Sequence, residues 1–182
     1  MEPALRRLVR EFPPPARPRF APVYWERLER GIGLEYPSTF KAFVDAYGGS
    51  VWFDTVSVDC DQARTDASVR KFAKFLKELL GCLNGSMYDD RGRDMHLPLY
   101  PARGGLLPFV SDYHSGIGCW QTSRKSPDDW PVVYWLRGPV IVRRNSTIAK
   151  LLCDFLDAKP YMAQIWGDVR EYEPERIRLT EM

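Results

Sequence analysis

The chain has 182 residues, 45% of them hydrophobic and 13% aromatic, so it can fold as one domain with a sizeable core. Lys and Arg number 26 against 24 Asp and Glu, a formal net charge of +2 that argues against sequence-independent binding of nucleic acid. Residues 1–10 lack the apolar run of a signal peptide, and no window of the sequence approaches 18 apolar residues. We therefore expect a cytoplasmic protein without a membrane span.

No two of the four cysteines form a CxxC pair, the close spacing that zinc sites and redox motifs usually show. We expect reduced and mostly buried thiols in a reducing compartment. These cysteines are Cys60, Cys82, Cys119 and Cys153. The sequence also lacks a Walker loop, a GxGxxG fingerprint and an HExxH helix, so no cofactor or metal is expected.

The N-terminal region predicts a short helix followed by an extended strap. Leu5, Leu8 and Val9 share one helix face. The prolines between residues 13 and 18 end this helix, because proline lacks the backbone donor and fixes φ. The globular part begins near residue 20. The predicted divisions of the chain are 1–19 for the helix and strap, 20–158 for the globular domain and 159–182 for a C-terminal extension.

Three further helices are predicted in the first half of the globular domain. In the first, Trp25, Leu28 and Ile32 recur at near-helical spacing, and Gly31 and Gly33 end the helix. The second covers 38–47, with Ser38 as its N-cap. The third is longer and is capped by Thr65 or Asp66.

This long helix, expected to end near Leu80, has one buried stripe and one basic face. The stripe includes Val69, Phe72 and Leu76 at helical spacing. A nucleic-acid patch is one interpretation of the basic face, and we favour the solvated outer face of an amphipathic helix. The basic residues are Arg70, Lys71, Lys74 and Lys77.

Strands are predicted before and after the long helix. Val51–Val58 is rich in β-branched and aromatic residues and predicts the first strand. Residues 84–93 are polar and Gly-rich and predict a loop. Beyond them, short apolar runs separated by turn residues predict an antiparallel meander. Its predicted strands are Met95–Tyr100, Leu106–Val110, Ile117–Thr122, Pro131–Leu136 and Val140–Arg143.

A last helix follows these strands, and we expect Asn145 or Ser146 to cap it and Pro160 to close it. Helices, then a run of strands, then a helix predict the α+β class. The sequence does not predict the fold of residues 159–182.

Histidine is the commonest general base in catalysis, and the chain contains only His96 and His114. His96 lies in an apolar strand pattern and is expected to be a packed or edge histidine. His114 follows Asp112 by two residues in a turn-like segment, where a hydrolase site is one interpretation and ordinary turn chemistry is another. We favour turn chemistry and expect no catalytic activity.

Several motifs occur in an order that resembles a known family. Residues 25–49 contain a Trp-led helix, a turn with Pro37, an aromatic-bearing helix and a terminal Gly-Gly. Later come a Gly-Gly-Leu-Leu-Pro-Phe run, a Gly-x-x-x-Trp strand, an Asp-Trp-Pro-Val-Val strand and a closing helix. These four motifs span 104–109, 116–120, 129–133 and 146–155. In this order the motifs resemble the SMI1/KNR4-like (SUKH) domains over most of the chain.

The resemblance implies an α+β fold with a central, mostly antiparallel sheet of about five to six strands flanked by helices. It also implies a function, because many bacterial members are immunity proteins that bind and neutralise a cognate toxin, often a nuclease or a deaminase. Other members are scaffold or regulatory proteins, which is the alternative, and a hydrolase using Asp112 and His114 is a lesser one. We expect a non-catalytic toxin-binding protein, monomeric or weakly dimeric, that contacts neither nucleic acid nor membrane directly.

Toxin binding would use aromatic anchors surrounded by charged side chains, as other protein interfaces do. We expect Trp25 and Trp120 in the core, and for Trp130 a packing role is also the favoured interpretation. If the toxin is a nuclease with a basic active site, acidic loops at Asp59–Asp66 or Asp89-Asp90 could mimic phosphate. The candidate partner-binding residues are Trp52, Asp54, Asp112, Tyr113, His114, Arg124, Trp130 and Arg137.

Overall fold

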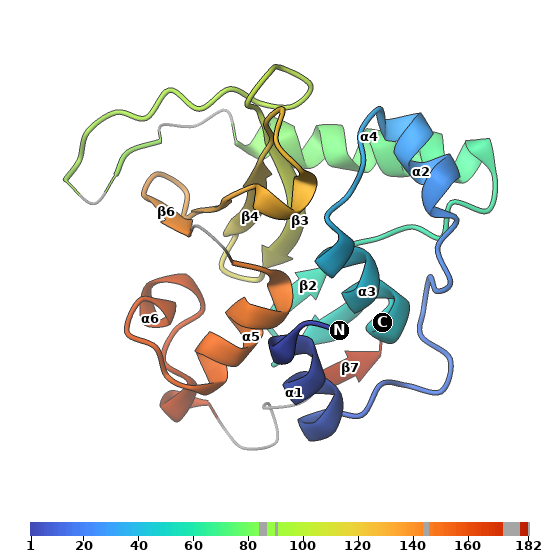
Figure 1. Cartoon of the computed structure of the whole chain (residues 1–182). Helices are drawn as coiled ribbons and strands as arrows, with labels where there is room; N and C mark the ends of the chain where they lie inside the picture. The colour runs from blue at the N-terminus through green and yellow to red at the C-terminus, as the bar shows by residue number, and fades with distance from the viewer. Residues whose placement is uncertain (84–86, 90, 144–145, 173–178, 182) are drawn as a thin grey trace.

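The computed structural model describes residues 1–83, 87–89, 91–143, 146–172 and the backbone of 179–181 (Figure 1). Residues 84–86 and 90 of the predicted 84–93 loop lie outside these ranges. The helices are α1 (Pro3–Glu11), α2 (Trp25–Ile32), α3 (Ser38–Tyr47), α4 (Asp66–Cys82), α5 (Ile148–Leu156) and α6 (Met162–Ile165), with the 3₁₀ helices η1 (Pro127–Asp129) and η2 (Val169–Glu171). The strands are β1 (Ser50–Trp52), β2 (Val56–Val58), β3 (Leu106–Asp112), β4 (Ile117–Gln121), β5 (Val132–Trp135), β6 (Val140–Arg143) and β7 (Leu179–Glu181).

The described strands form one seven-stranded sheet in the order β6-β5-β4-β3-β2-β1-β7. Every neighbouring pair is antiparallel, and strands β3 to β6 follow the predicted meander. The seventh strand, β7, pairs with β1 and comes from the C-terminal extension, whose fold the sequence does not predict. The predicted α+β class is confirmed.

The single strand predicted at Val51–Val58 is wrong, because the segment is a hairpin of β1 and β2. Trp52 pairs with Val56 across the turn. In this three-residue loop Phe53 and Asp54 are the central residues of a β-turn that the Thr55 N–H closes on the Trp52 carbonyl at 3.0 Å, and their φ of 58° and 51° lie in the left-handed region that a type I′ turn requires. Neither residue is a glycine, so the sequence lacks the usual signal of such a turn.

The strand predicted at Met95–Tyr100 is also wrong. This segment is irregular, and only Leu99 forms an isolated bridge, with Leu106. Pro98 and Pro101 flank Leu99, and a proline cannot donate a hydrogen bond to a strand ladder. Met95, Leu97 and Leu99 pack instead against a small hydrophobic core that includes Leu106 and Cys119.

The helix caps explain where α4 and α5 begin. Thr65 caps α4 as predicted, since its hydroxyl accepts the Ser68 N–H at 3.2 Å and the Ser68 hydroxyl accepts the Thr65 N–H in return. For α5 the predicted cap is wrong. The cap is Thr147, whose hydroxyl accepts a first-turn N–H at 3.1 Å, while Ser146 is buried beside it. Asn145, the other candidate, lies outside the described residues.

The α3 helix has a cap that no local pattern could show. Ser38, the predicted N-cap, is already the first helical residue, and the position before it is Pro37. The carboxylate of Asp128 in η1 accepts the backbone N–H of Ser38 at 2.7 Å and that of Thr39 at 3.4 Å. A negative charge at a helix N-terminus is stabilising, so Asp128 fixes η1 against α3.

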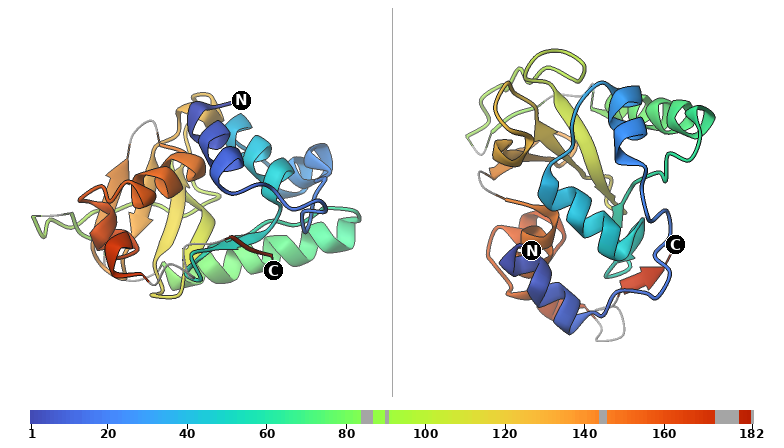
Figure 2. Two further views of the ribbon diagram at one scale, coloured as in Figure 1. Left: turned by 90° about the horizontal axis from the view of Figure 1, so that it is seen from below. Right: turned by 45° about the vertical axis from the view of Figure 1, so that its right-hand side comes forward.

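Helices cover both faces of the sheet (Figure 2). Figure 2 shows α1, α3 and α5 on one face and α4 across the other. The main hydrophobic core is formed by buried side chains of these helices together with those of the sheet. It includes Leu5 and Leu8 of α1, and Met162 and Trp166 from the segment after α5. A second, smaller core lies between the sheet and the C-terminal part of α4, around Leu83, Leu106, Ile117, Cys119 and Val133.

Candidate functional site

Three hairpin turns lie together at one end of the sheet. In an antiparallel meander every second connection lies at the same end, which brings together the β1–β2, β3–β4 and β5–β6 turns. We call residues 53–55, 112–116 and 136–139 the turn edge. The Tyr113 N–H donates to the Thr55 carbonyl at 3.1 Å and joins two of these turns. The predicted site residues brought together here are Asp54, Asp112, Tyr113, His114 and Arg137.

Asp112 organises the turn edge from inside. Its side chain is only 8% exposed. Oδ1 accepts the backbone N–H groups of His114 at 2.8 Å and Gly116 at 2.9 Å, and Oδ2 accepts the Tyr134 hydroxyl at 2.6 Å. The indole N–H of Trp166 donates to the Tyr134 oxygen at 2.7 Å. A buried polar chain therefore links the segment after α6 to the β3–β4 turn.

Two features keep the hydrogen-bonded chain of Asp112, Tyr134 and Trp166 in place. Burial raises the pKa of Tyr134 well above its ordinary value, and the negative charge of Asp112 raises it further, so the phenol remains a donor at neutral pH. Gly116 leaves room for both groups, because a Cβ there would collide with the Asp112 carboxylate and lie 2.8 Å from the Tyr134 ring. The turn is thus shaped by packing as well as by hydrogen bonds.

The residues next to Asp112 face solvent. Tyr113 is 70% exposed, the largest exposed fraction of any bulky apolar side chain after Met1 in the described ranges. His114 and Arg137 are exposed as well, and Asp54 is half-buried. An aromatic side chain on a rigid turn, with charged neighbours, is a typical anchor of a protein interface.

Two hollows flank the β3–β4 turn and share Asp112 and Gly116. One, of about 360 Å³, lies towards α6 and is lined also by His114 and Gln164. The other, of about 400 Å³, lies towards α4 and is lined also by Trp135 and by Leu79 and Cys82 of that helix. A partner that covers Tyr113 could insert a side chain on either side of it.

The other predicted site residues lie elsewhere. Trp52 is 0% exposed, meets the Tyr47 ring edge-to-face with centroids 4.9 Å apart and donates to the Ser50 hydroxyl at 3.0 Å, so it is removed from the surface available to a partner. Trp130 is 7% exposed and donates to the Ser123 carbonyl at 3.3 Å, in agreement with the favoured packing role. Arg124 is exposed in the β4–β5 connection, at the opposite end of the sheet from the turn edge.

The two tryptophans assigned to the core by sequence differ in burial. Trp120 is buried and stacks on Phe109 with ring centroids 4.1 Å apart. Trp25 is half-buried at the start of α2, and its indole N–H donates to Asp45 at 3.1 Å.

The hydrolase interpretation needs a hydrogen bond between the His114 imidazole and a carboxylate. Asp112 instead binds the backbone N–H of His114, and its second oxygen is taken by Tyr134. This is the ordinary turn chemistry of aspartate, in which the side chain accepts the N–H two residues on. The geometry gives Asp112 a structural role in shaping the turn.

In the acidic loops predicted to mimic phosphate, several aspartate side chains already bind neighbouring residues. Asp59 accepts hydrogen bonds from Ser57 and Ser111, and burial raises its pKa. Asp61 accepts the Ala63 N–H at 2.7 Å. Arg93 lowers the pKa of Asp89 by pairing with it. Asp90 lies outside the described residues.

Sequence reasoning missed Tyr134 and Trp166, which support the site without reaching its surface. Tyr134 lies in an apolar strand pattern, where nothing distinguishes a phenol that needs a buried partner from one that faces solvent. Trp166 lies in the segment whose fold the sequence does not predict. A buried tyrosine or tryptophan usually finds a hydrogen-bond partner, which is the one general signal available.

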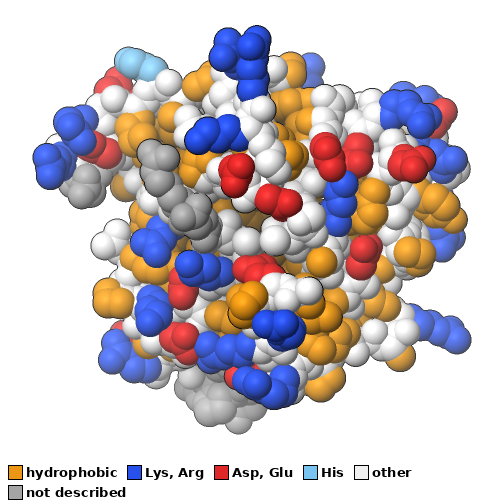
Figure 3. Space-filling model, viewed as in Figure 1, with side chains coloured by type: hydrophobic (Ala, Val, Ile, Leu, Met, Phe, Trp, Pro, Cys, Tyr) orange, Lys and Arg blue, Asp and Glu red, His pale blue; other side chains and the backbone are white. Residues whose placement is uncertain are grey.

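Charged side chains of both signs are interspersed over the face drawn in Figure 3, with hydrophobic side chains exposed between them. In the parts of the chain that the structure describes, no three His, Cys, Asp or Glu side chains are grouped so as to hold a metal ion. None of the described helices combines the length and the apolar character needed to cross a membrane.

Comparison with known proteins identified no relative of this chain. A scan of protein-family models found no match, and searches of curated proteins and of solved structures found none either. The resemblance to SMI1/KNR4-like domains stays a prediction from the sequence motifs.

Proposed function

We propose that the protein is a non-catalytic binding domain whose turn edge contacts a protein partner. Following the family resemblance, the proposed partner is a cognate toxin domain of nuclease or deaminase type, which the protein neutralises in the cytoplasm by direct binding. The observation that carries the proposal is the exposed Tyr113 side chain, adjacent to the buried Asp112–Tyr134–Trp166 chain.

An exposed tyrosine on a rigid turn should reduce the entropy that is lost on binding. A tyrosine offers a large contact area for two torsions, so little freedom is lost when a partner covers it. The turn that carries Tyr113 is held by the two backbone hydrogen bonds that Asp112 accepts and by the contact with Thr55. A surface already rigid before binding loses less entropy than a flexible loop does.

Free thiols support the proposed cytoplasmic location. All four cysteines are unpaired, and burial raises the pKa of Cys60 to about 12 and that of Cys153 to about 11. Raised pKa values keep thiols protonated and poorly reactive at neutral pH. Unpaired cysteines are typical of reducing compartments.

Growth rescue and calorimetry test the proposal. The toxin domain encoded beside this gene would be expressed with and without the protein, and the purified pair titrated. We expect rescue and a 1:1 complex. Tyr113→Ala should then weaken binding by about 2 kcal/mol or more, roughly thirtyfold in Kd. Tyr24→Ala is the matched control, because Tyr24 is 53% exposed at the N-cap of α2 and lies outside the turn edge.

Each outcome has a defined meaning. Rescue with loss of binding in Tyr113→Ala alone supports both the function and the site. Rescue with equal binding by both variants supports immunity and overturns the turn edge as the site. Neither rescue nor heat of binding overturns immunity for that pair, and partners captured from lysate would then test the scaffold alternative.

A further inference from the structure

A groove runs between α2 and α4. Two adjoining hollows of about 540 and 330 Å³ form it and share Gly31 and Ala73. The α2–α4 groove is bounded at one end by Leu99 and Tyr100, which lie next to the start of β3, whereas the turn edge begins where β3 ends. Helix α4 reaches both surfaces, because Leu79 and Cys82 line one of the hollows beside the turn edge. Lys77 and Gly81 line the groove and not that hollow, so substitutions at these two positions test the groove separately from the proposed function.

The floor of the groove is apolar. Ile32, Leu76, Leu80 and Leu99 line the larger hollow, whose volume falls in the range of typical ligand sites. The two helices approach closely at Gly31, where a Cβ would collide with Val69. This close crossing fixes the position of the groove walls.

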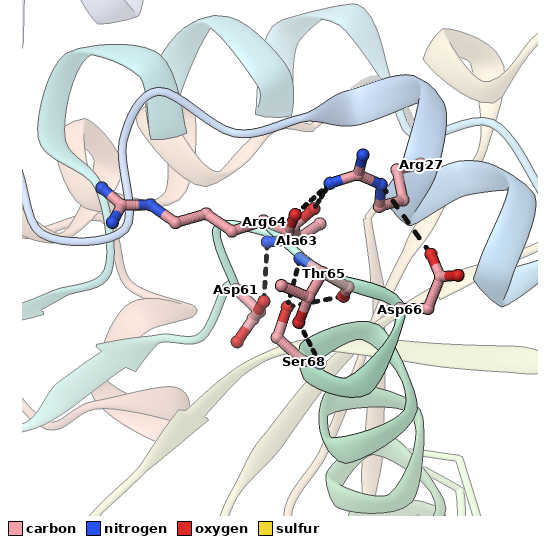
Figure 4. A network of polar contacts seen from close by, with 7 residues as sticks. All are labelled: Arg27, Asp61, Ala63, Arg64, Thr65, Asp66 and Ser68. Atoms are coloured by element: carbon pink, nitrogen blue, oxygen red, sulfur yellow. Dashed lines mark hydrogen bonds and ion pairs between the residues drawn. The ribbon is translucent and has the colours of Figure 1, made fainter.

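The walls are cationic. Arg27, Arg30, Arg70 and Lys77 line the two hollows, against a single acidic residue, Asp66. Arg27 is held in place, because its guanidinium donates to the carbonyls of Ala63, at 3.1 Å, and Arg64 and lies 3.8 Å from the Asp66 carboxylate (Figure 4). The other three cations have no ion pair with an acidic residue in the described part of the chain.

Gly81 adds an independent observation. It lies in the last turn of α4 and lines the larger hollow, and a Cβ built there meets nothing within 4 Å. A glycine disfavours a helix relative to alanine, so the fold gains nothing from this residue. An element approaching α4 closely at this point would explain it.

We propose that the α2–α4 groove binds an acidic amphipathic helix of a protein partner. The apolar floor would take the apolar face of that helix, and the unpaired cations would meet carboxylates on either side of it. From Arg70 to Gly81 the wall of α4 is about 16 Å long, which matches three turns of a helix. Nucleic acid fits less well, because an apolar floor offers nothing to a phosphate backbone.

A pair of fluorescein-labelled helical peptides tests this proposal by anisotropy with the whole chain. Both carry leucines at helical i, i+3, i+4 and i+7 spacing. One has glutamates at the flanking positions, and its twin has lysines there. We expect the glutamate peptide to bind about tenfold or more tightly than the lysine twin.

Three variants locate the binding. Lys77→Glu should weaken the glutamate peptide about tenfold, whereas Lys71→Glu, with the same charge change on a residue that lines neither hollow, should leave it within about twofold. Gly81→Leu should also abolish binding by filling the groove. Because Leu forms helices better than Gly, this variant should melt no lower than the wild type, which separates blocked binding from lost fold.

Several results would overturn the proposal. They are equal binding of the two peptides, equal effects of Lys77→Glu and Lys71→Glu, and no binding of either peptide. Saturable binding of dodecanoate without peptide binding would assign the groove to a small organic anion instead. Self-association in sedimentation that Lys77→Glu abolishes would assign it to a second copy of the chain.

Discussion

The turn edge and the α2–α4 groove are two different kinds of surface on one small molecule. The turn edge projects an aromatic side chain from a turn that a buried carboxylate holds with three hydrogen bonds. The groove is a hollow whose walls are set by the close packing of two helices at Gly31. We therefore expect the turn edge to lose stability when a buried polar partner is removed or a methyl group is added at Gly116. We expect binding in the groove to weaken when the volume or charge of its lining changes. Four substitutions test this difference.

The largest effect is expected for Asp112→Ala. It leaves the buried Tyr134 hydroxyl and two turn N–H groups without their acceptor, so we expect a loss of about 3–5 kcal/mol in the free energy of unfolding. Urea denaturation with an unchanged m-value measures it. Asp129→Ala, on the exposed 3₁₀ helix η1, is the control and should stay within about 0.5 kcal/mol. A loss below about 1 kcal/mol for Asp112→Ala would mean that the polar chain does not hold the turn.

Gly116→Ala tests the same turn through volume. The added methyl would collide with the Asp112 carboxylate and press on the Tyr134 ring, so one of the two must move. We expect a loss of about 2–3 kcal/mol, in the range of overpacked cores. Thermal unfolding gives the value, and the same variant should weaken any partner that binds through Tyr113. An unchanged melting temperature would show that the turn is more adaptable than its contacts indicate.

Sequence patterns predicted much of the fold because local rules fix most element types. Helical periodicity and the Thr65 cap located α4, and alternation of apolar runs with turns located β3 to β6. The errors have long-range causes. Ser38 is replaced as a cap by Asp128, which is distant in sequence, and the Phe53-Asp54 turn has no glycine to mark it.

The candidate site was predictable in part for a similar reason. Turn-like composition identified Tyr113 and His114, which the structure places on the surface. It could not show that Trp52, at the end of a short strand, turns into the core. Nor could it show that Asp112 is held by Tyr134, since the two residues meet only after three strands have paired.

Alkaline pH should weaken the buried polar chain at Tyr134, together with other tyrosines whose pKa burial also raises, such as Tyr36 and Tyr47. The folded-state pKa of Tyr134 is raised above the unfolded value of about 10, first by burial and then by Asp112. Its contribution to stability is therefore complete below pH 10 and is lost as the pH rises above 10 towards the folded pKa. The loss is about 1.4 kcal/mol per pH unit for such a group.

Tyr134→Phe isolates this contribution. At pH 7 the variant should be about 1–2 kcal/mol less stable, because the Trp166 N–H and the Asp112 carboxylate lose a partner. Its free energy of unfolding should fall less steeply than that of the wild type between pH 10 and pH 11, measured by urea titrations at each pH. Parallel pH profiles would show that Tyr134 does not ionise on unfolding in this range.

The smallest effect, and the only gain, is expected for Gly81→Ala in the wall of the groove. A Cβ there meets nothing within 4 Å, and alanine favours a helix over glycine, so we expect about 0.5–1 kcal/mol of added stability. Gly31→Ala is the matched control on the facing helix. The same methyl collides with Val69 there and should destabilise the protein, so the two substitutions should shift the melting temperature in opposite directions.

The sign of the Gly81→Ala effect decides whether the glycine belongs to the fold or to the groove. A gain in stability means that α4 tolerates a glycine it does not need, which is expected where an approaching helix requires the space. A loss means that the last turn of α4 itself requires glycine, and the close approach of a partner is then no longer needed to explain it. In that case only the cationic walls and the apolar floor would support the proposal that the groove binds an acidic helix. Binding of the glutamate peptide would then be the deciding test of that proposal.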